Sequence, residues 1–132
     1  MTILESMIVL YADDDWEDLE FFAAMLKIVD PNATCIYARD GIEAIETLSN
    51  SLVVPDYIFL DINMPVMDGR TCLREIRKDH RFADVPIVIY TTSSDPKEKE
   101  LCLELGAAAY LFKPTTIETG IVSLSHFFTK KA

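Results

Sequence analysis

The chain has 132 residues, of which 50% are hydrophobic and 26% are charged, a balance typical of one globular domain with a single core. Its formal net charge of -10 argues against direct contact with nucleic acid or an anionic membrane surface, because both bind chiefly through Lys and Arg. No apolar run reaches the length of a membrane span, and three cysteines without metal-ligand spacing indicate reduced thiols in a cytoplasmic protein. We expect one domain over residues 1–132, with no effector domain.

The first third of the chain predicts a strand, a helix and a second strand. An apolar run at residues 7–12 predicts a buried strand. A stripe of helical period follows, which Asp15 is placed to cap and Pro31 to end. The run at residues 35–38 is followed at once by charged residues, and we expect it at the edge of the sheet. The helical stripe consists of Leu19, Phe22, Met25, Leu26 and Val29.

The rest of the chain continues this alternation. Apolar runs at residues 57–60, 87–90 and 109–112 predict three more strands, and helical spacing predicts a helix before, between and after them. Gly120 lies within the last helix and is expected to weaken it. Alternating strands and helices predict an α/β fold with a parallel sheet covered on both sides. The four helical patterns are Ile42, Ile45 and Leu48; Leu73 and Ile76; Leu101 and Leu105; and Ile117, Ile121, Leu124 and Phe128.

Polar residues follow four of the five predicted strands. Asp13 and Asp14 follow the first, Asp61 the third, Thr91 the fourth and Lys113 the fifth. Ligands of open parallel sheets bind beyond the carboxyl ends of the strands. We therefore expect these side chains to share one cleft.

The residue types in this cleft indicate a phosphoacceptor site. Converging carboxylates repel one another, and an oxygen-seeking cation such as Mg²⁺ offsets them better than one lysine. Phosphoryl transfer depends mainly on positioning and charge neutralisation. Asp61 is the natural nucleophile, because a carboxylate can accept a phosphoryl group directly. Lys113 and Thr91 suit the phosphoryl oxygens.

Four segments in this order resemble the receiver domains of response regulators. Residues 8–15 are similar to the acidic first-strand motif, residues 61–69 to the phosphoacceptor segment, residues 90–92 to the hydroxyl-bearing strand end, and residues 106–114 to the segment ending in lysine and proline. The similarity covers residues 7–128, the expected core of the domain. It implies a flavodoxin-like, doubly wound sheet of five parallel strands in the order 2-1-3-4-5.

The resemblance also implies the metal ligands and the phosphoacceptor. Asp13, Asp14 and Asp61 would bind Mg²⁺, together with the backbone carbonyl of Asn63, and Mn²⁺ is expected to be able to replace Mg²⁺. Asp61 would accept the phosphoryl group.

Further roles follow from the same resemblance. Thr91 would be the switch hydroxyl, Lys113 the phosphate-binding amine and Tyr110 the aromatic residue that reorients on phosphorylation. Asn63 and Ser93 fall at positions that tune the lifetime of the phosphate. The peptide bond between Lys113 and Pro114 is expected to be cis.

The implied function is that of a stand-alone response regulator in a two-component phosphorelay. Its expected partners are a sensor histidine kinase or a histidine phosphotransfer protein, and a downstream protein bound through the fourth helix, fifth strand and fifth helix. Val122, His126 and Phe127 are candidates for that surface. The resemblance also allows a homodimer that forms on phosphorylation. We expect no enzymatic activity beyond the domain's own phosphorylation and dephosphorylation.

Three other functions compete with this interpretation. A phosphatase of the haloacid-dehalogenase type would need a second acid where Asn63 stands. A flavodoxin-like flavin carrier would need Gly, Ser or Thr around a phosphate, where this chain has the acidic segment of residues 13–18. A degenerate receiver would bind partners without phosphorylation, and the complete set of acids, threonine and lysine argues against it.

Overall fold

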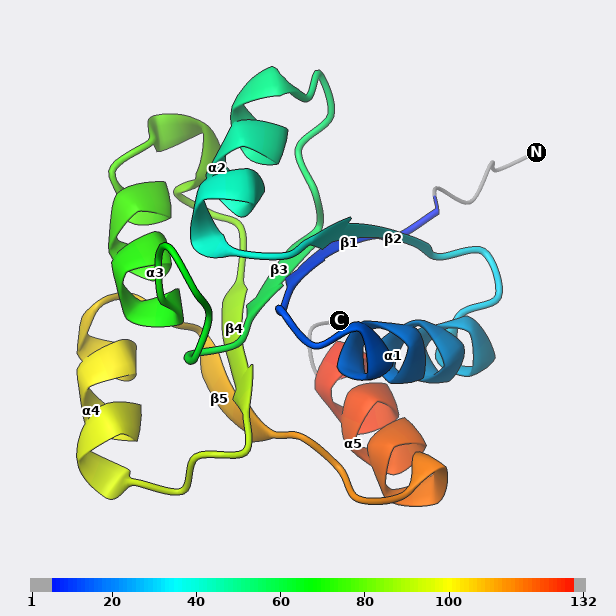
Figure 1. Ribbon diagram of the computed structural model, residues 1–132. Helices are drawn as coiled ribbons and strands as arrows, with labels where there is room; N and C mark the ends of the chain where they lie inside the picture. Colours follow the sequence, from blue (N-terminus) through cyan, green and yellow to red (C-terminus); the bar gives the residue numbers. More distant parts are fainter. Residues whose placement is uncertain (1–5, 130–132) are drawn as a thin grey trace.

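A computed structural model of the chain describes residues 6–129, so residues 1–5 and 130–132 of the expected domain lie outside the described part (Figure 1). Five parallel strands form one sheet in the order β2-β1-β3-β4-β5, as expected. The strands are β1 (Ile8–Ala12), β2 (Thr34–Ala38), β3 (Tyr57–Leu60), β4 (Ile87–Thr91) and β5 (Ala109–Phe112). The helices are α1 (Trp16–Val29), α2 (Gly41–Asn50), α3 (Gly69–Arg77), the 3-10 helix η1 (His80–Phe82), α4 (Pro96–Glu104) and α5 (Ile117–Thr129).

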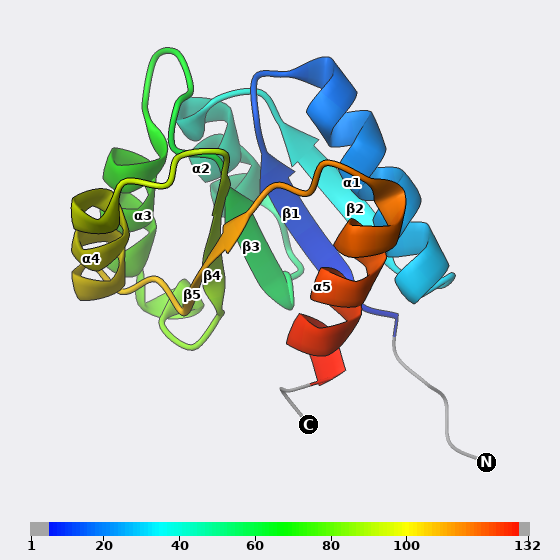
Figure 2. The same cartoon turned by 90° about the horizontal axis from the view of Figure 1, so that it is seen from below.

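The helices cover both faces of the sheet. In Figures 1 and 2, α1 and α5 lie on one face, and α2, α3 and α4 lie on the other. Successive residues of a strand point to opposite faces, so Tyr11 belongs to the core on the side of α1 and α5, while Leu10 belongs to the core on the other face. Both faces are buried, which explains why most of the strands read as continuous apolar runs. None of the helices within residues 6–129 is long and apolar enough to cross a membrane.

Aspartates begin the first four α-helices. The side chains of Asp15, Asp40, Asp68 and Asp95 each accept a hydrogen bond from a backbone N–H in the first turn of their helix. Such N-caps satisfy amide groups that the helix itself leaves unpaired. Part of the chain's negative charge therefore serves to start helices.

The helical pattern expected for α2 is only partly correct. Leu48 is buried as expected, but Ile42 is 38% exposed and Ala44 is buried in its place. The reason lies at the start of the helix, where a Cβ on Gly41 would come within 2.7 Å of the backbone oxygen of Met67. The two small residues let α2 approach this loop, and that contact sets which face of the helix is buried.

Gly120 allows α5 to pack closely against α1, in addition to the expected weakening of α5 by a glycine. A Cβ at this position would lie 2.1 Å from Sδ of Met25 in α1 and 2.8 Å from Cγ of Pro114. The absence of a side chain lets α5 approach α1 closely. The tertiary contact accounts for the glycine, although glycine disfavours a helix interior by about 1 kcal/mol.

Candidate functional site

Three carboxylates surround one ammonium group at the carboxyl end of the sheet. Ala12 of β1 pairs with Leu60 of β3, so the residues that follow them, Asp13 and Asp61, are neighbours. Nζ of Lys113 lies 2.6 Å from Oδ2 of Asp13, 3.1 Å from Oδ2 of Asp61 and 2.8 Å from Oδ2 of Asp18. Residues from three strand ends and from α1 thus form one ion-pair cluster.

Asp18 is the member of this cluster that sequence reasoning missed. It lies in the first turn of α1, with its side chain 37% exposed. Acidic residues are favoured at helix N-termini by the helix dipole alone, so its presence there pointed to no contact. Its place one turn after the Asp15 cap, close in sequence to Asp13 and Asp14, does not by itself indicate an ion pair.

Asp13 is completely buried and hydrogen-bonded through both carboxylate oxygens. Oδ1 accepts a hydrogen bond from the backbone N–H of Asp15 at 2.9 Å. Oδ2 accepts hydrogen bonds from the hydroxyl of Tyr11 at 2.5 Å and from Nζ of Lys113. A buried carboxylate needs such partners, and these three hydrogen bonds fix the orientation of Asp13.

Asp61 lies at the end of β3 with 7% of its surface exposed. Its Oδ1 accepts a hydrogen bond from the N–H of Ile62 at 2.8 Å, and Oδ2 faces Lys113. Burial raises the pKa of Asp61 above its ordinary value; Lys113 partly lowers it and Asp13 adds to the rise. A Cβ on Gly69 would lie 2.2 Å from the backbone oxygen of Asp61, so the start of α3 can pack there only as glycine.

Lys113 remains a cation in this setting. Burial by itself would lower the pKa of Lys113, but its hydrogen bonds to Asp13 and Asp18 and the charge of Asp61 raise the pKa above the ordinary value. Its side chain is 10% exposed. The cluster therefore favours the charged form of this lysine at the carboxyl end of the sheet.

The acids fit a divalent cation. Asp13, Asp14 and Asp61 each offer one carboxylate oxygen, and these oxygens lie within 4.8 Å of one another. An all-oxygen donor set is what Mg²⁺ and Mn²⁺ prefer. Lys113 pairs with Asp13, Asp61 and Asp18, and Asp14 adds a fourth carboxylate beside Asp13 and Asp61. The excess negative charge favours a cation. Asn63 is exposed in the loop after β3, and its carbonyl stays a predicted ligand.

The hydroxyl groups of Thr91 and Tyr110 are both hydrogen-bonded to the backbone of Ser93. Thr91 follows Ile87 and Ile89 on the face covered by α3 and α4, and it is completely buried. Its Oγ1 accepts a hydrogen bond from the N–H of Ser93 at 3.2 Å. The hydroxyl of Tyr110 donates to the carbonyl oxygen of Ser93 at 3.0 Å. The loop between β4 and α4 is thereby attached to both expected switch residues.

The expected cis bond before Pro114 is wrong. No peptide bond within residues 6–129 is cis, so the bond between Lys113 and Pro114 is trans. The trans form is the more stable one for most bonds that precede proline, by about 0.5–1 kcal/mol. Lys113 reaches all three carboxylates with this bond in the trans form.

Of the three residues of α5 that were expected on an outer surface, two are exposed and one packs against the core. Val122 is 68% exposed and His126 is exposed. Phe127 instead packs its ring against Tyr57 and Phe59, with centroid distances of 5.5 and 5.9 Å. Phe127 was therefore the wrong choice for an outer surface, because its ring completes the core under α5.

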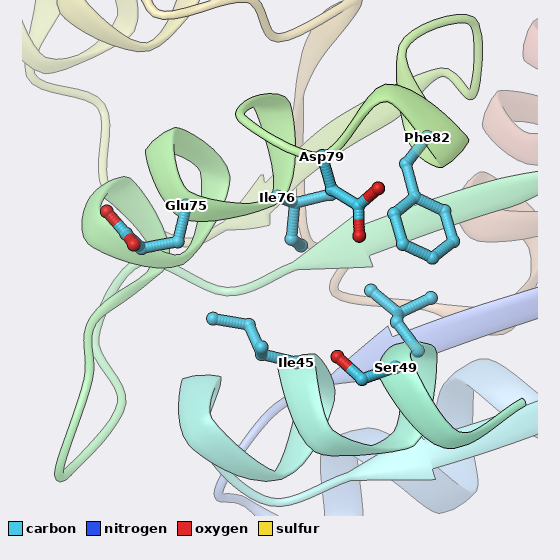
Figure 3. Close-up of a pocket in the computed structure, with 7 residues that line it drawn as sticks. Ile45, Ser49, Glu75, Ile76, Asp79 and Phe82 are labelled. Carbon is cyan, nitrogen blue, oxygen red and sulfur yellow. The ribbon is translucent and has the colours of Figure 1, made fainter.

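A small cavity lies between the side chains of α2 and those of α3 and η1 (Figure 3). Its volume is about 40 Å³, and its lining combines apolar side chains with Ser49, Glu75 and Asp79. Helices of a parallel α/β unit run opposite to the strands, so these C-terminal helix ends lie at the amino edge of the sheet. A space of this size suits ordered water rather than an organic ligand.

Comparisons with known proteins agree with this geometry. The chain is 35% identical over 107 residues to the sensor histidine kinase CheAY of Helicobacter pylori, a match that covers 81% of this chain and 13% of that protein. The chain thus spans a small part of that relative's length.

Two solved structures share the fold. The chemotaxis response regulator CheY4 of Vibrio cholerae is 29% identical with a TM-score of 0.80, over 92% of this chain and 98% of that one. The Mn²⁺-bound form of response regulator Rcp1 is 26% identical with a TM-score of 0.80, over 92% and 91%. The sequence model of the response regulator receiver domain matches residues 9–124. The chain therefore belongs to the response regulator receiver family of two-component signalling.

Proposed function

We propose that this receiver accepts a phosphoryl group on Asp61 and, in response, switches a contact with a downstream protein. The observation that carries this proposal is the ion-pair cluster, in which Oδ2 of the buried Asp61 lies 3.1 Å from Nζ of Lys113. The lysine is at the right place to hold a phosphoryl oxygen as the new bond forms. The nucleophile and the cation come from strands β3 and β5, so the sheet itself fixes their separation.

Asp13, Asp14 and Asp61 would hold Mg²⁺, with the backbone carbonyl of Asn63 as a fourth protein ligand. When bound, the ion would supply positive charge beside the incoming phosphoryl group. Mn²⁺ would serve in its place, since both ions take oxygen ligands, and the similar Rcp1 chain has been solved in an Mn²⁺-bound form.

The transfer forms a bond between phosphorus and a carboxylate oxygen of Asp61 and breaks the bond between phosphorus and the donor atom. We expect that donor to be a histidine nitrogen of a sensor kinase or of a phosphotransfer protein. Lys113 would hold the transferred group by a charge-assisted hydrogen bond. To do so it must give up part of its contact with Asp13 and Asp18.

The response would pass through Thr91, Ser93 and Tyr110. If a phosphoryl oxygen attracts the hydroxyl of Thr91, the hydrogen bond from the Ser93 N–H to that hydroxyl breaks. Tyr110 donates a hydrogen bond to the carbonyl of Ser93, so a movement of Ser93 would also affect Tyr110. Asn63 and Ser93 would tune the lifetime of the acyl phosphate. A local contact of this kind can bias a two-state surface.

The surface that changes would be formed by α4, β5 and α5. Leu103, Phe112 and Val122 are exposed apolar residues of these three elements, and they would provide the contact with a downstream protein or with a second copy of the chain. We assign no enzymatic turnover to the domain beyond its own phosphorylation and dephosphorylation, and we place it in the cytoplasm with its kinase.

Intact mass spectrometry after incubation with acetyl phosphate tests this function. Wild type should gain the mass of one phosphoryl group only when Mg²⁺ is present, and Asp61→Asn should gain none. Asp79→Asn is the matched control, because Asp79 caps η1 at the opposite end of the sheet. Phosphorylation of Asp61→Asn at the wild-type level would refute the assignment. No gain in any protein would favour a receiver that binds partners without phosphorylation.

A further inference from the structure

A buried tyrosine lies directly beneath the acidic cluster. Tyr11 is 0% exposed, and its hydroxyl donates a hydrogen bond of 2.5 Å to Oδ2 of Asp13. The two residues are two positions apart at the end of β1, and side chains at that spacing point to the same face of a sheet. The position of Tyr11 in the strand thus brings its hydroxyl to the carboxylate.

Aromatic packing fixes where this hydroxyl can lie. The ring of Tyr11 contacts Phe22 at a centroid distance of 4.6 Å and Tyr90 at 5.6 Å. Protein cores are packed too densely for a ring in such a position to rotate away without displacing its neighbours. The rings therefore hold the Tyr11 hydroxyl, and the hydroxyl holds one oxygen of Asp13.

Tyr90 provides an internal comparison. It lies in the same aromatic cluster with 3% of its surface exposed, and its hydroxyl has no hydrogen-bond partner among the described residues. Tyr11 and Tyr90 are thus two buried phenols in one aromatic cluster. Only the hydroxyl of Tyr11 donates a hydrogen bond to a carboxylate of the ion-pair cluster.

We propose that Tyr11 is a positioning residue for the cation site, which keeps Asp13 oriented toward Asp14 and Asp61. This inference rests on the proposed function, in which these three acids hold Mg²⁺. Oδ2 of Asp13 is shared between Tyr11 and Lys113. When Lys113 moves toward a phosphoryl group, Tyr11 keeps the carboxylate in place. Partners that orient a metal ligand contribute to affinity even though they never touch the ion.

The test compares Mg²⁺ dissociation constants of wild type, Tyr11→Phe and Tyr90→Phe, measured by calorimetry and by the fluorescence of Trp16. Trp16 is 55% exposed at the start of α1. Removal of an orienting partner should weaken Mg²⁺ binding by Tyr11→Phe about 10-fold. Tyr90→Phe removes the same atom without breaking a hydrogen bond, and its constant should stay within about twofold of wild type.

A purely structural role predicts a different result. Tyr11→Phe would then lose stability in urea but bind Mg²⁺ with the wild-type constant, and this outcome overturns the proposal. An equal loss of affinity in Tyr90→Phe also overturns it, because the effect would belong to the aromatic cluster as a whole. If Tyr11→Phe alone does not fold, the double variant Tyr11→Phe/Tyr90→Phe tests the same hydrogen bond, because removal of the unpaired buried hydroxyl of Tyr90 should recover stability.

Phosphorylation by acetyl phosphate separates this inference from the function on which it rests. At saturating Mg²⁺, Tyr11→Phe should approach the wild-type rate, while at low Mg²⁺ it should be slower. If wild type binds Mg²⁺ but is never phosphorylated, the proposed function fails, and the dissociation constants still decide the role of Tyr11. If wild type binds no Mg²⁺, the role of Tyr11 fails as well.

Discussion

Lys113→Met should strongly destabilise the protein when Mg²⁺ is absent. Methionine nearly matches the shape of lysine but removes the ammonium, and the carboxylates of Asp13 and Asp61 would face each other without a counter-charge. Their side chains are 0% and 10% exposed, so water can replace little of what is lost. Removal of one partner from a buried ion pair costs about 3–5 kcal/mol.

For Lys113→Met we expect the lower end of this range of about 3–5 kcal/mol. Asp18 is 37% exposed and can be rehydrated, and a small movement of Asp61 would relieve part of the repulsion. We expect a loss of about 3 kcal/mol, which lowers the ratio of folded to unfolded protein by about 150-fold.

Urea unfolding at neutral pH with a chelator present would measure this loss. Lys99→Met is the control, because Lys99 is exposed on α4 and its replacement should change stability by no more than about 0.5 kcal/mol. Added Mg²⁺ should restore part of the stability of Lys113→Met, since a bound cation stabilises the folded state. A loss below about 1 kcal/mol in the chelator would show that the lysine does not offset a buried charge and would refute this reasoning.

Three further predictions concern charge and packing. Asp61→Asn should be more stable than wild type at neutral pH but not at acidic pH. Burial raises the pKa of Asp61 in the folded protein above its ordinary value of 3.8. Wild type therefore loses stability as the pH rises from that ordinary value through the folded pKa. Urea midpoints at several pH values measure this, and a constant difference would contradict it. Asp14→Ala should abolish the response of Trp16 fluorescence to Mg²⁺; an unchanged titration would place the ion elsewhere. Gly120→Ala should destabilise the protein by about 1–3 kcal/mol through overpacking against Met25. A thermal midpoint equal to or above that of wild type would show that α1 and α5 can move apart without cost, and would contradict this prediction.

The sheet and the strand-end residues could be predicted because they depend on local patterns. Buried parallel strands appear as apolar runs whatever their partners, and the shared edge of such a sheet brings the residues after each run together. Asp13, Asp61 and Lys113 could therefore be placed in one site without any knowledge of their contacts.

Features that depend on contacts between elements could not be found in this way. The burial of Ala44 in place of Ile42 follows from the approach of Gly41 to a loop that is distant in sequence. Gly120 is explained by Met25 on another helix. The ion pair of Asp18 is equally invisible, because acids at helix starts are common without one.

The two sets of expected site residues lie on opposite faces of the sheet, so a substitution on one face need not disturb the side-chain contacts on the other. The ion-pair cluster and Tyr11 lie on the side of α1, whereas Thr91 ends β4 and Tyr110 lies within β5, on the face that α3 and α4 cover. A backbone hydrogen bond of 2.9 Å from Lys113 N–H to the Thr91 carbonyl joins the two sets. Because this bond joins two backbone groups, a side-chain substitution on either face can leave the connection between the faces intact.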